Sequence, residues 1–486
     1  MAVVPALCLS VALTVGITVD QMVGIGLGGL LLLWLVPRPA VVVRAFVVVL
    51  PFQLLALSGV LALGVSSGIV QVAGLWKELA ALALGLAAWE SVRRSPRPTD
   101  ALDRIAGGFV LLGTAYLVAQ PVLADRVGSA VTGTDRLASW RATVLPVALL
   151  LAARHVRLSA TQLDRIVRSA VRVAVVLGMI ALVELVASDG WNAFVVDTLG
   201  VNRYRSQVLR IPVQALGSGL ADVRVYGLVG GHRIVRMGGP MLGQLEFSFL
   251  LLVLLAVLLE RVVAPGPSRL AAGTAALVGV ALLLTQTRSS ILGAAVVVLV
   301  VLRPRPGRSE EARHRLAIAL VALAVLLVPL AIGYGVAGRF TIGDPASNED
   351  HTTQIHRAAD VVVHHPLGQG LGTGALASSL LTPGAVAAED QLLDVGVQLG
   401  IVGMALFAGT VLALLVALRR AGDATAGTVG TTARGLRSAL LGLLVPCWVL
   451  QPFLTPEVGW VVFALAGAAL GAAERPTTTP TPRGAA

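Results

Sequence analysis

The chain has 486 residues, of which 56% are hydrophobic and only 13% are charged, and apolar runs of membrane-spanning length recur along it. This composition excludes both an ordinary soluble domain and a disordered chain, and it predicts a polytopic integral membrane protein. The net charge of +11 would suggest a nucleic-acid partner in a soluble protein, but here the arginines cluster in short segments between apolar runs, so no nucleic acid is expected.

The start of the chain and its two cysteines give no sign of a cleaved signal peptide or of cysteine chemistry. The first run follows Met1 without a basic segment, which favours a retained span over a cleaved signal peptide. Cys8 and Cys447 both lie inside apolar runs, where a cysteine behaves as a small buried hydrophobe. A disulfide or a cysteine-bound metal is therefore not expected.

Arginine-rich clusters punctuate the chain and are typical of cytoplasmic loops, since cytoplasmic loops carry an excess of positive charge. One helical hairpin fits between each consecutive pair of clusters, and the two terminal runs supply two more. The sequence therefore predicts an all-α protein of about 14 transmembrane helices with both termini cytoplasmic. The clusters lie at residues 38–44, 93–104, 154–172, 261–269, 303–315 and 419–437.

Every span is expected to be helical, because an open sheet edge cannot satisfy its backbone in lipid. Spans 139–153 and 289–302 are short for a bilayer, which predicts tilting or a partly re-entrant path. The expected spans are 3–19, 21–36, 42–63, 70–90, 105–121, 139–153, 170–188, 241–259, 270–286, 289–302, 316–336, 391–418, 437–453 and 457–473.

The topology leaves two long external loops, at residues 189–240 and 337–390, within a single transmembrane domain that covers residues 1–473. Long loops in compact domains are usually functional or disordered, and these two carry aromatic residues or a helical pattern. We expect a helical stretch from Gln354 to His364 that ends before Pro366. Residues 474–486 are polar and rich in proline, and they predict a disordered cytoplasmic tail.

Three arginines beside apolar spans are assigned to the external side: Arg236, Arg288 and Arg357. Arginine next to hydrocarbon is costly unless it pairs with an anion, so this placement predicts a site for a phosphorylated lipid. The alternative is that Arg236 and Arg288 only extend to the membrane interface and that Arg357 is solvated.

Acidic and histidine side chains of the second external loop are candidates for proton transfer. Glu389 and Asp390 are the candidate catalytic pair, and their alternative role is to cap the helix that follows. His356, His364 and His365 are secondary candidates that fit equally well as surface residues, and no metal is expected. The GQGLGTG segment after Pro366 lacks a preceding strand, so it fits a flexible turn better than a phosphate-binding loop.

Four segments in order give the chain a resemblance to the O-antigen ligase and polymerase superfamily. They are RMGGPMLGQLEF at residues 236–247, LLLTQTRSS with Thr287 and Arg288, the loop helix with Arg357 followed by HPLGQGLG at 365–372, and EDQLLDVGVQLGIVG at 389–403. The resemblance covers roughly residues 230–410. It implies a membrane glycosyltransferase whose donor is a polyprenyl-diphosphate-linked glycan and whose acceptor is a glycan or lipid at the outer face of the bacterial cytoplasmic membrane.

The resemblance also assigns roles. Arg236, Arg288 and Arg357 would bind the donor diphosphate, without a cofactor. Where ligases of this superfamily begin the last segment with histidine and asparagine, this chain has Glu389 and Asp390, which favours polymerase over ligase activity. The family's helix-breaking residues after Gln244 are replaced, and Glu246 stands at the asparagine position as a further candidate.

Two other classes of function remain open. A transporter would explain many spans but should place ionisable or broken-helix features near the membrane midplane, often in two repeated halves. A flippase for lipid-linked sugars would need a cationic path across the membrane. The arginines here crowd one surface instead, which favours the transferase.

Overall fold

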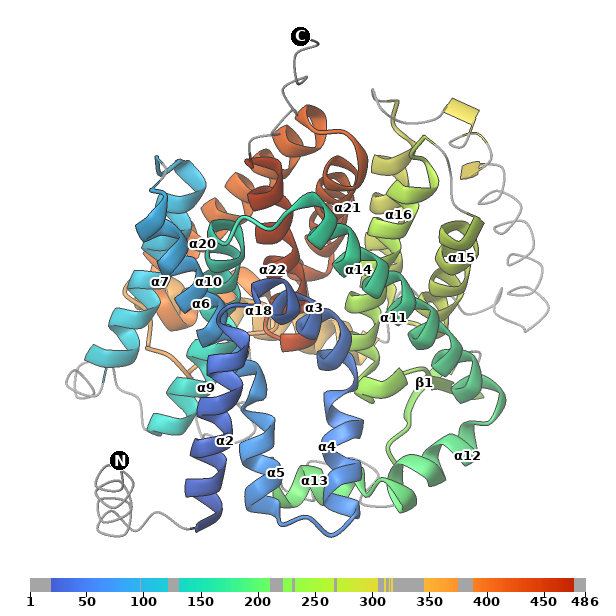
Figure 1. Cartoon of the computed structure of the whole chain (residues 1–486). Helices are drawn as coiled ribbons and strands as arrows, with labels where there is room; N and C mark the ends of the chain where they lie inside the picture. The colour runs from blue at the N-terminus through green and yellow to red at the C-terminus, as the bar shows by residue number, and fades with distance from the viewer. Residues whose placement is uncertain are drawn as a thin grey trace.

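The computed structural model describes most of the chain, and the described part is almost entirely helical (Figure 1). The described residues are 19–96, 98–120, 131–209, 222–229, 232–265, 269–304, 310–311, 314, 316–317, 345–374 and 388–475. Of these, the first half forms α2 (Val19–Leu35), α3 (Pro39–Val49), η1 (Leu50–Phe52), α4 (Gln53–Ala62), α5 (Ser67–Gly74), α6 (Trp76–Arg94), α7 (Ala101–Ala119), α9 (Gly133–Thr143), α10 (Leu145–His155), α11 (Ala160–Val186), α12 (Ser188–Ala193), η2 (Phe194–Thr198) and α13 (Val201–Gln207). The second half forms β1 (Val225–Val229), β2 (His232–Arg236), η4 (Gly239–Met241), α14 (Gln244–Val262), α15 (Arg269–Leu284), α16 (Arg288–Leu302), α18 (Pro345–His364), α20 (Gln391–Ala424), α21 (Gly427–Leu443), η6 (Pro446–Trp448) and α22 (Pro456–Ala473).

Six helices of the described chain are long and apolar enough to cross a membrane, and α9 with α10 makes a seventh if that pair, bent by 46°, is one span. The all-α membrane architecture agrees with the sequence, but the predicted number of 14 spans is not confirmed. Helices α15 and α16 are apolar but shorter. The predicted span 3–19 and nearly all of 316–336 lie outside the described residues. The six are Pro39–Ala62, Ser67–Arg94, Ala101–Ala119, Ala160–Val186, Gln391–Ala424 and Pro456–Ala473.

Two predicted spans have the wrong bounds. The span expected at residues 170–188 begins ten residues earlier, because α11 starts at Ala160 within the basic cluster 154–172. Residues 437–453 were expected to be helical, whereas α21 runs from Gly427 to Leu443 and is followed by turns. The basic cluster 419–437 led to a predicted loop, but Arg434 is buried inside α21. Its guanidinium donates to the Gly422 carbonyl and lies 3.8 Å from the Glu260 carboxylate. These partners let the helix begin about three turns earlier than the charge pattern indicated.

Helices α14, α21 and α22 form the centre of the bundle, where glycines let neighbouring backbones approach. A Cβ on Gly467 would lie 2.2 Å from the Leu150 carbonyl of α10, and one on Gly435 would lie 2.8 Å from Val257 of α14. Small residues at such contacts are a common means of packing helices in membranes. Figure 1 shows α22 near the middle of the bundle, with α10 and α14 beside it.

The two long loops that were predicted to be external contain ordered structure. The first holds α12, the π-helical turn η2, α13 and an antiparallel hairpin of β1 and β2, which the sequence did not predict. Tyr204 of α13 and Val208 just after it pack against Leu57 of α4 and Val70 of α5, so α13 lies below these helices in Figure 1. The second loop holds α18, which ends at His364 as predicted but begins at Pro345.

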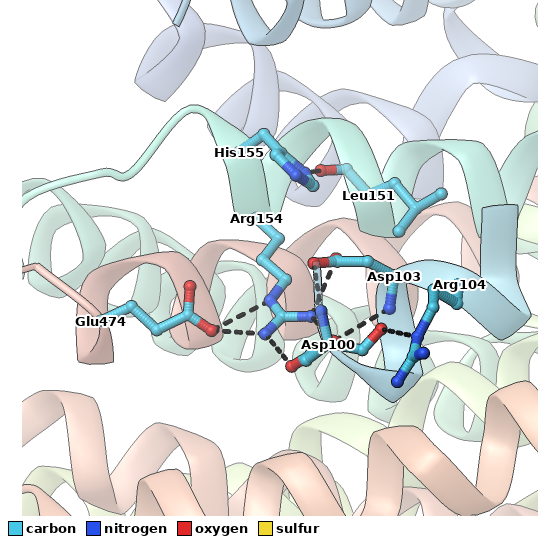
Figure 2. A network of polar contacts seen from close by, with 7 residues as sticks. All are labelled: Asp100, Asp103, Arg104, Leu151, Arg154, His155 and Glu474. Carbon is cyan, nitrogen blue, oxygen red and sulfur yellow. Dashed lines mark hydrogen bonds and ion pairs between the residues drawn. The ribbon is translucent and has the colours of Figure 1, made fainter. Parts of the chain in front are cut away.

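An ion-pair cluster around Arg154 lies at the ends of α7, α10 and α22 (Figure 2). The buried Arg154 guanidinium contacts the carboxylates of Asp100 at 2.6 Å, Asp103 at 2.9 Å and Glu474 at 2.6 Å. These residues come from two predicted cytoplasmic loops and from the start of the predicted tail, so one cluster joins three segments that the charge pattern placed on one side. Glu474 therefore belongs to the helical body, and residues 476–486 of the predicted tail lie outside the described chain.

Candidate functional site

Arg236 is the last residue of β2 and is held against the turn between α15 and α16. Its Nε donates to the Thr285 carbonyl at 3.1 Å, and its Nη2 donates to the Gln286 carbonyl at 3.4 Å and to Thr287 Oγ1 at 3.3 Å. The backbone N–H of Met237 adds a hydrogen bond to the Leu284 carbonyl. The RMGGP segment and the TQTR segment, about 50 residues apart, therefore form one unit.

Glu184 fixes the turn that follows Arg236. Its buried carboxylate, from α11, accepts the backbone N–H groups of Gly238 at 3.2 Å and Gly239 at 2.8 Å. Gly239 has φ +56°, and a Cβ there would lie 2.7 Å from the Phe247 ring, so this position requires glycine. Sequence analysis missed Glu184, because nothing in its apolar helix indicates two glycine partners more than 50 residues away.

Arg288 is the first residue of α16 and is exposed, close enough to Arg236 for their charges to interact. Burial lowers the pKa of Arg236, and the positive charge of Arg288 lowers it further. The N-terminus of a helix is also unfavourable for a cation. Within the described part of the chain, no carboxylate forms an ion pair with either guanidinium. We call these two residues the arginine pair.

Glu246 lies in the first turn of α14, where an acidic side chain complements the helix dipole. It interacts electrostatically with Arg205 of α13, a further arginine that sequence analysis did not single out. Burial lowers the pKa of Arg205 and Glu246 opposes that shift. Arg205 thus differs from the arginine pair, because a carboxylate lies near it.

Helix α18 carries Arg357 and the histidines on its exposed surface. Ala358 and Val362 pack against α20, whereas Arg357, His356 and His364 are exposed, as is His365 just after the helix. Among the described contacts, none joins Arg357 to the arginine pair. The structure therefore brings together two of the three predicted phosphate ligands, and it leaves Arg357 and the histidines on a separate helix.

The acidic pair lies at the beginning of α20. Asp390 is the N-cap: its Oδ1 accepts the N–H groups of Leu392 and Leu393, both at 2.8 Å. Burial raises the pKa of Asp390, and these two hydrogen bonds oppose the rise. The alternative capping role is thus confirmed for Asp390, while Glu389 beside it is half-buried. No described contact connects this pair with the arginine pair.

The glycine-rich segment after α18 is not a simple flexible turn, because it fills a break in α20. Gly400 has φ +71° and interrupts the helix. The N–H groups of Gln369 and Gly370 donate to the carbonyls of Val397 and Gln398 at 2.7 and 3.0 Å, and the Ile401 N–H donates to the Pro366 carbonyl at 2.9 Å. The loop supplies partners for backbone groups that the break would leave unpaired in an apolar bundle.

Side chains of α7 hold the same loop. Gln120 accepts from the Leu371 N–H at 2.9 Å and donates to the Leu371 carbonyl at 3.3 Å, and the Tyr116 hydroxyl donates to the Leu367 carbonyl. Gly368, Gly370 and Gly372 all have positive φ. In the described residues, no group of three or more histidine, cysteine or carboxylate side chains is placed to hold a metal ion.

A family model described as O-Antigen ligase matches residues 273–408 of the chain. The matched segment begins in α15 and ends in α20, so it contains Arg288, α18, the glycine-rich loop and the acidic pair, while Arg236 precedes it. A comparison with curated proteins gives no match.

Proposed function

Because the chain belongs to the O-antigen ligase and polymerase superfamily, we propose that it transfers glycan units from a polyprenyl-diphosphate donor to a glycan acceptor at the outer face of the bacterial cytoplasmic membrane. In this proposal the protein is a polymerase rather than a ligase, because Glu389 and Asp390 stand where ligases of the superfamily carry histidine and asparagine. The donor diphosphate binds at the arginine pair.

The arginine pair is the observation that carries this proposal. The two guanidinium groups lie near one another at the end of a membrane bundle. Among the described residues, their hydrogen-bond partners are all neutral, so their positive charge is not compensated. A diphosphate offers several oxygens that match the planar fork of arginine, and it would relieve the repulsion between Arg236 and Arg288. The hydrogen bonds to Thr285 and Thr287 hold Arg236 ready without removing its charge.

The reaction requires charge stabilisation on one side and proton removal on the other. An acceptor hydroxyl oxygen forms a bond to the anomeric carbon, and the bond from that carbon to the diphosphate oxygen breaks. The bonding electrons leave with the diphosphate, where Arg236 and Arg288 stabilise the added negative charge. The hydroxyl proton passes to a carboxylate, for which Glu389 and Asp390 are the candidates.

Arg357 has a role in this proposal that differs from that of the arginine pair, because it lies on the helix next to the acidic pair. It lies on α18, whose buried face packs on the first turns of α20 next to the acidic pair. No described contact joins Arg357 to the arginine pair, so in this proposal it binds the sugar-bearing part of the substrate. His356, His364, His365 and Glu246 are kept as weaker candidates for proton transfer.

Transfer in vitro tests the site assignment. Purified protein in nanodiscs would be supplied with a lipid-linked oligosaccharide, and the products would be separated by length. We expect Arg236→Ala and Arg288→Ala to remove most transfer, and we expect repeated addition rather than a single transfer from the wild type. Unchanged transfer by both variants would refute the donor site, and single transfer would favour ligase activity.

The pH dependence of transfer tests the acidic pair. A base must be deprotonated, and burial raises the pKa of Asp390, so its acid limb should lie at higher pH than for an ordinary aspartate. We expect Asp390→Asn to abolish this limb together with most of the activity if Asp390 is the base, and Glu389→Gln to do so if Glu389 is. Full activity in both variants, with loss in a His364 or His365 variant, would show that a histidine is the base.

A further inference from the structure

A buried carboxylate in α20, Asp394, lies at the centre of side-chain contacts that sequence analysis did not single out. Asp394 is 0% exposed, and its Oδ2 accepts from Gln398 Nε2 at 2.7 Å. The side chain of Gln451 also interacts with this carboxylate, whose Oδ1 is buried without a hydrogen-bond partner among the described residues. We call Asp394, Gln398 and Gln451 the Asp394 network.

One side of the network holds the glycine-rich loop. Gln398 Oε1 accepts from the Gly372 N–H at 3.2 Å and from the Ser139 hydroxyl of α9. A Cβ on Gly374 would lie only 2.8 Å from Asp394 Oδ1, so the loop passes directly over the carboxylate. This loop begins where α18 ends, so its position sets the C-terminal end of the helix that carries Arg357.

The other side of the network holds the acidic pair. Gln451, from the segment before α22, donates to the Ala388 carbonyl, and Ala388 directly precedes Glu389. The Phe453 N–H donates to Gln391 Oε1 at 3.1 Å, which fixes the first residue of α20. Gly374 and Ala388 are themselves joined by a hydrogen bond of 3.3 Å between the Gly374 carbonyl and the Ala388 N–H.

A carboxylate in the interior of a membrane bundle is costly, and among the described contacts no arginine or lysine pairs with Asp394. Residues of this kind are usually kept for a function. Here the carboxylate has a defined task, since it accepts a hydrogen bond from Gln398, which contacts the glycine-rich loop, and interacts with Gln451, which contacts the residue before the acidic pair.

We propose that Asp394 is a positioning residue for the transfer site: because it lies against both Gln398 and Gln451, it holds the Arg357 helix and the Glu389–Asp390 turn in one fixed relation. The proposal rests on the proposed function only for the consequence on turnover. Asp394 does not contact the reacting groups in this account, and it acts through the loop and the turn.

The test exchanges the hydrogen-bonding partners within the network. In Asp394→Asn, one of the two carboxylate oxygens becomes an NH2 group. Whichever way the new side chain is turned, this NH2 group faces the NH2 group of Gln398 or of Gln451, and that contact is lost. In the double variant D394N/Q398E, the new glutamate accepts from the asparagine, from Gly372 and from Ser139. In the double variant, each of these donors therefore again has an acceptor. Thr410→Val is the matched control, because Thr410 lies in the same helix, is 0% exposed and donates only within the helix, to the Leu406 carbonyl at 2.7 Å.

Two readouts follow each variant. Nitroxide labels at Val363 of α18 and Leu111 of α7, both more than 70% exposed, give a distance distribution by electron paramagnetic resonance in a background where Cys8 and Cys447 are alanine. We expect a narrow distribution for wild type, T410V and D394N/Q398E, and a broad or shifted one for D394N. We expect kcat for transfer to fall about 10- to 100-fold in D394N, as misplacement of reacting groups does, and to recover in the double variant.

Several results would overturn the proposal. A narrow distribution with normal turnover in D394N would show that Asp394 positions nothing, and equal losses in T410V would show only a general cost of altering α20. If D394N fails to fold, the double variant decides: folding and activity support the proposal, and failure of both contradicts it. If wild type transfers no glycan, the proposed function fails, while the label distances still test the positioning role.

Discussion

Two arginine sites at different helix ends of the molecule have opposite surroundings. Arg154 is buried and contacts three carboxylates, from Asp100, Asp103 and Glu474, which join α7, α10 and α22 (Figure 2). Arg236 is half-buried and, among the residues that the structure describes, has only neutral oxygen partners, with the exposed Arg288 beside it. The first arginine is fully used by the fold, whereas the arginine pair has charge left for a ligand.

The difference teaches how to separate structural from functional arginines in a membrane protein. Position beside an apolar span does not distinguish them, because both sites flank spans. The number of carboxylate partners does. A buried arginine whose partners are acidic stabilises the bundle, and an arginine held in place by carbonyl and hydroxyl groups keeps its charge for an anion.

The largest expected effect is on stability at Arg154. Arg154→Met leaves the buried Asp103 carboxylate and its neighbours without their cation, and breaking such a pair costs about 3–5 kcal/mol. We expect a large fall in the unfolding midpoint in detergent, with normal turnover per folded molecule. The double variant R154M/D103N should recover part of the stability. Unchanged stability of R154M would remove the distinction between the two sites.

Arg288→Ala should have the opposite effect to Arg154→Met, with reduced activity and unchanged stability. It removes a donor to the leaving diphosphate, for which we expect kcat/KM to fall roughly 100-fold or more. Its unfolding midpoint should not fall, because the substitution also removes the repulsion with Arg236. Arg420→Ala, which removes an exposed arginine from the end of α20, is the control for a general loss of positive charge. A destabilised R288A with normal kinetics would mean that Arg288 is structural.

A carboxylate added beside the arginine pair should make it resemble the Arg154 cluster. The backbone carbonyl of Gln286 accepts from Arg236, so Gln286→Glu adds an acid to the turn that holds the arginine pair. We expect donor affinity to fall about 10-fold, with a stability gain of roughly 0.5 kcal/mol, the size of a partly exposed ion pair. Titration of the donor and thermal unfolding measure the two effects. An affinity equal to that of the wild type would argue against diphosphate binding at this turn.

The smallest effect is expected for Arg288→Lys. Lysine keeps the charge but not the planar pair of donors, so it binds phosphate as a point charge. We expect a loss of a few-fold in kcat/KM, measured in the same transfer assay. A loss as large as that of R288A would show that geometry, rather than charge, dominates at this position.

The sequence predicted features that depend on neighbours along the chain. Apolar runs located most of the described helices, and the pattern before Pro366 located the end of α18. Arg236 and Arg288 were also found, because an arginine beside an apolar run can be recognised from its neighbours in the sequence. Arg357 was grouped with them on the same reasoning, and the structure places it on a separate helix.

Features that depend on contacts between distant segments were not predictable. Glu184 reads as one acid in an apolar helix, and its partners Gly238 and Gly239 lie more than 50 residues away. The GQGLGTG segment resembled a turn, because its partners are backbone groups exposed only by the break at Gly400. Asp394 and Gln451 are joined only in the folded bundle. A single sequence gives no pairing of this kind, so these residues had no distinguishing pattern.

Binding of a short-chain prenyl diphosphate to the purified protein in nanodiscs tests the central claim, that the arginine pair binds the donor diphosphate. Calorimetric titration would compare wild type, R236A/R288A and R420A at 50 and 200 mM salt. We expect wild type and R420A to bind with equal affinity that weakens at higher salt, and R236A/R288A to bind at least 10-fold more weakly. Equal affinity in all three proteins would contradict the assignment of the arginine pair as the diphosphate site.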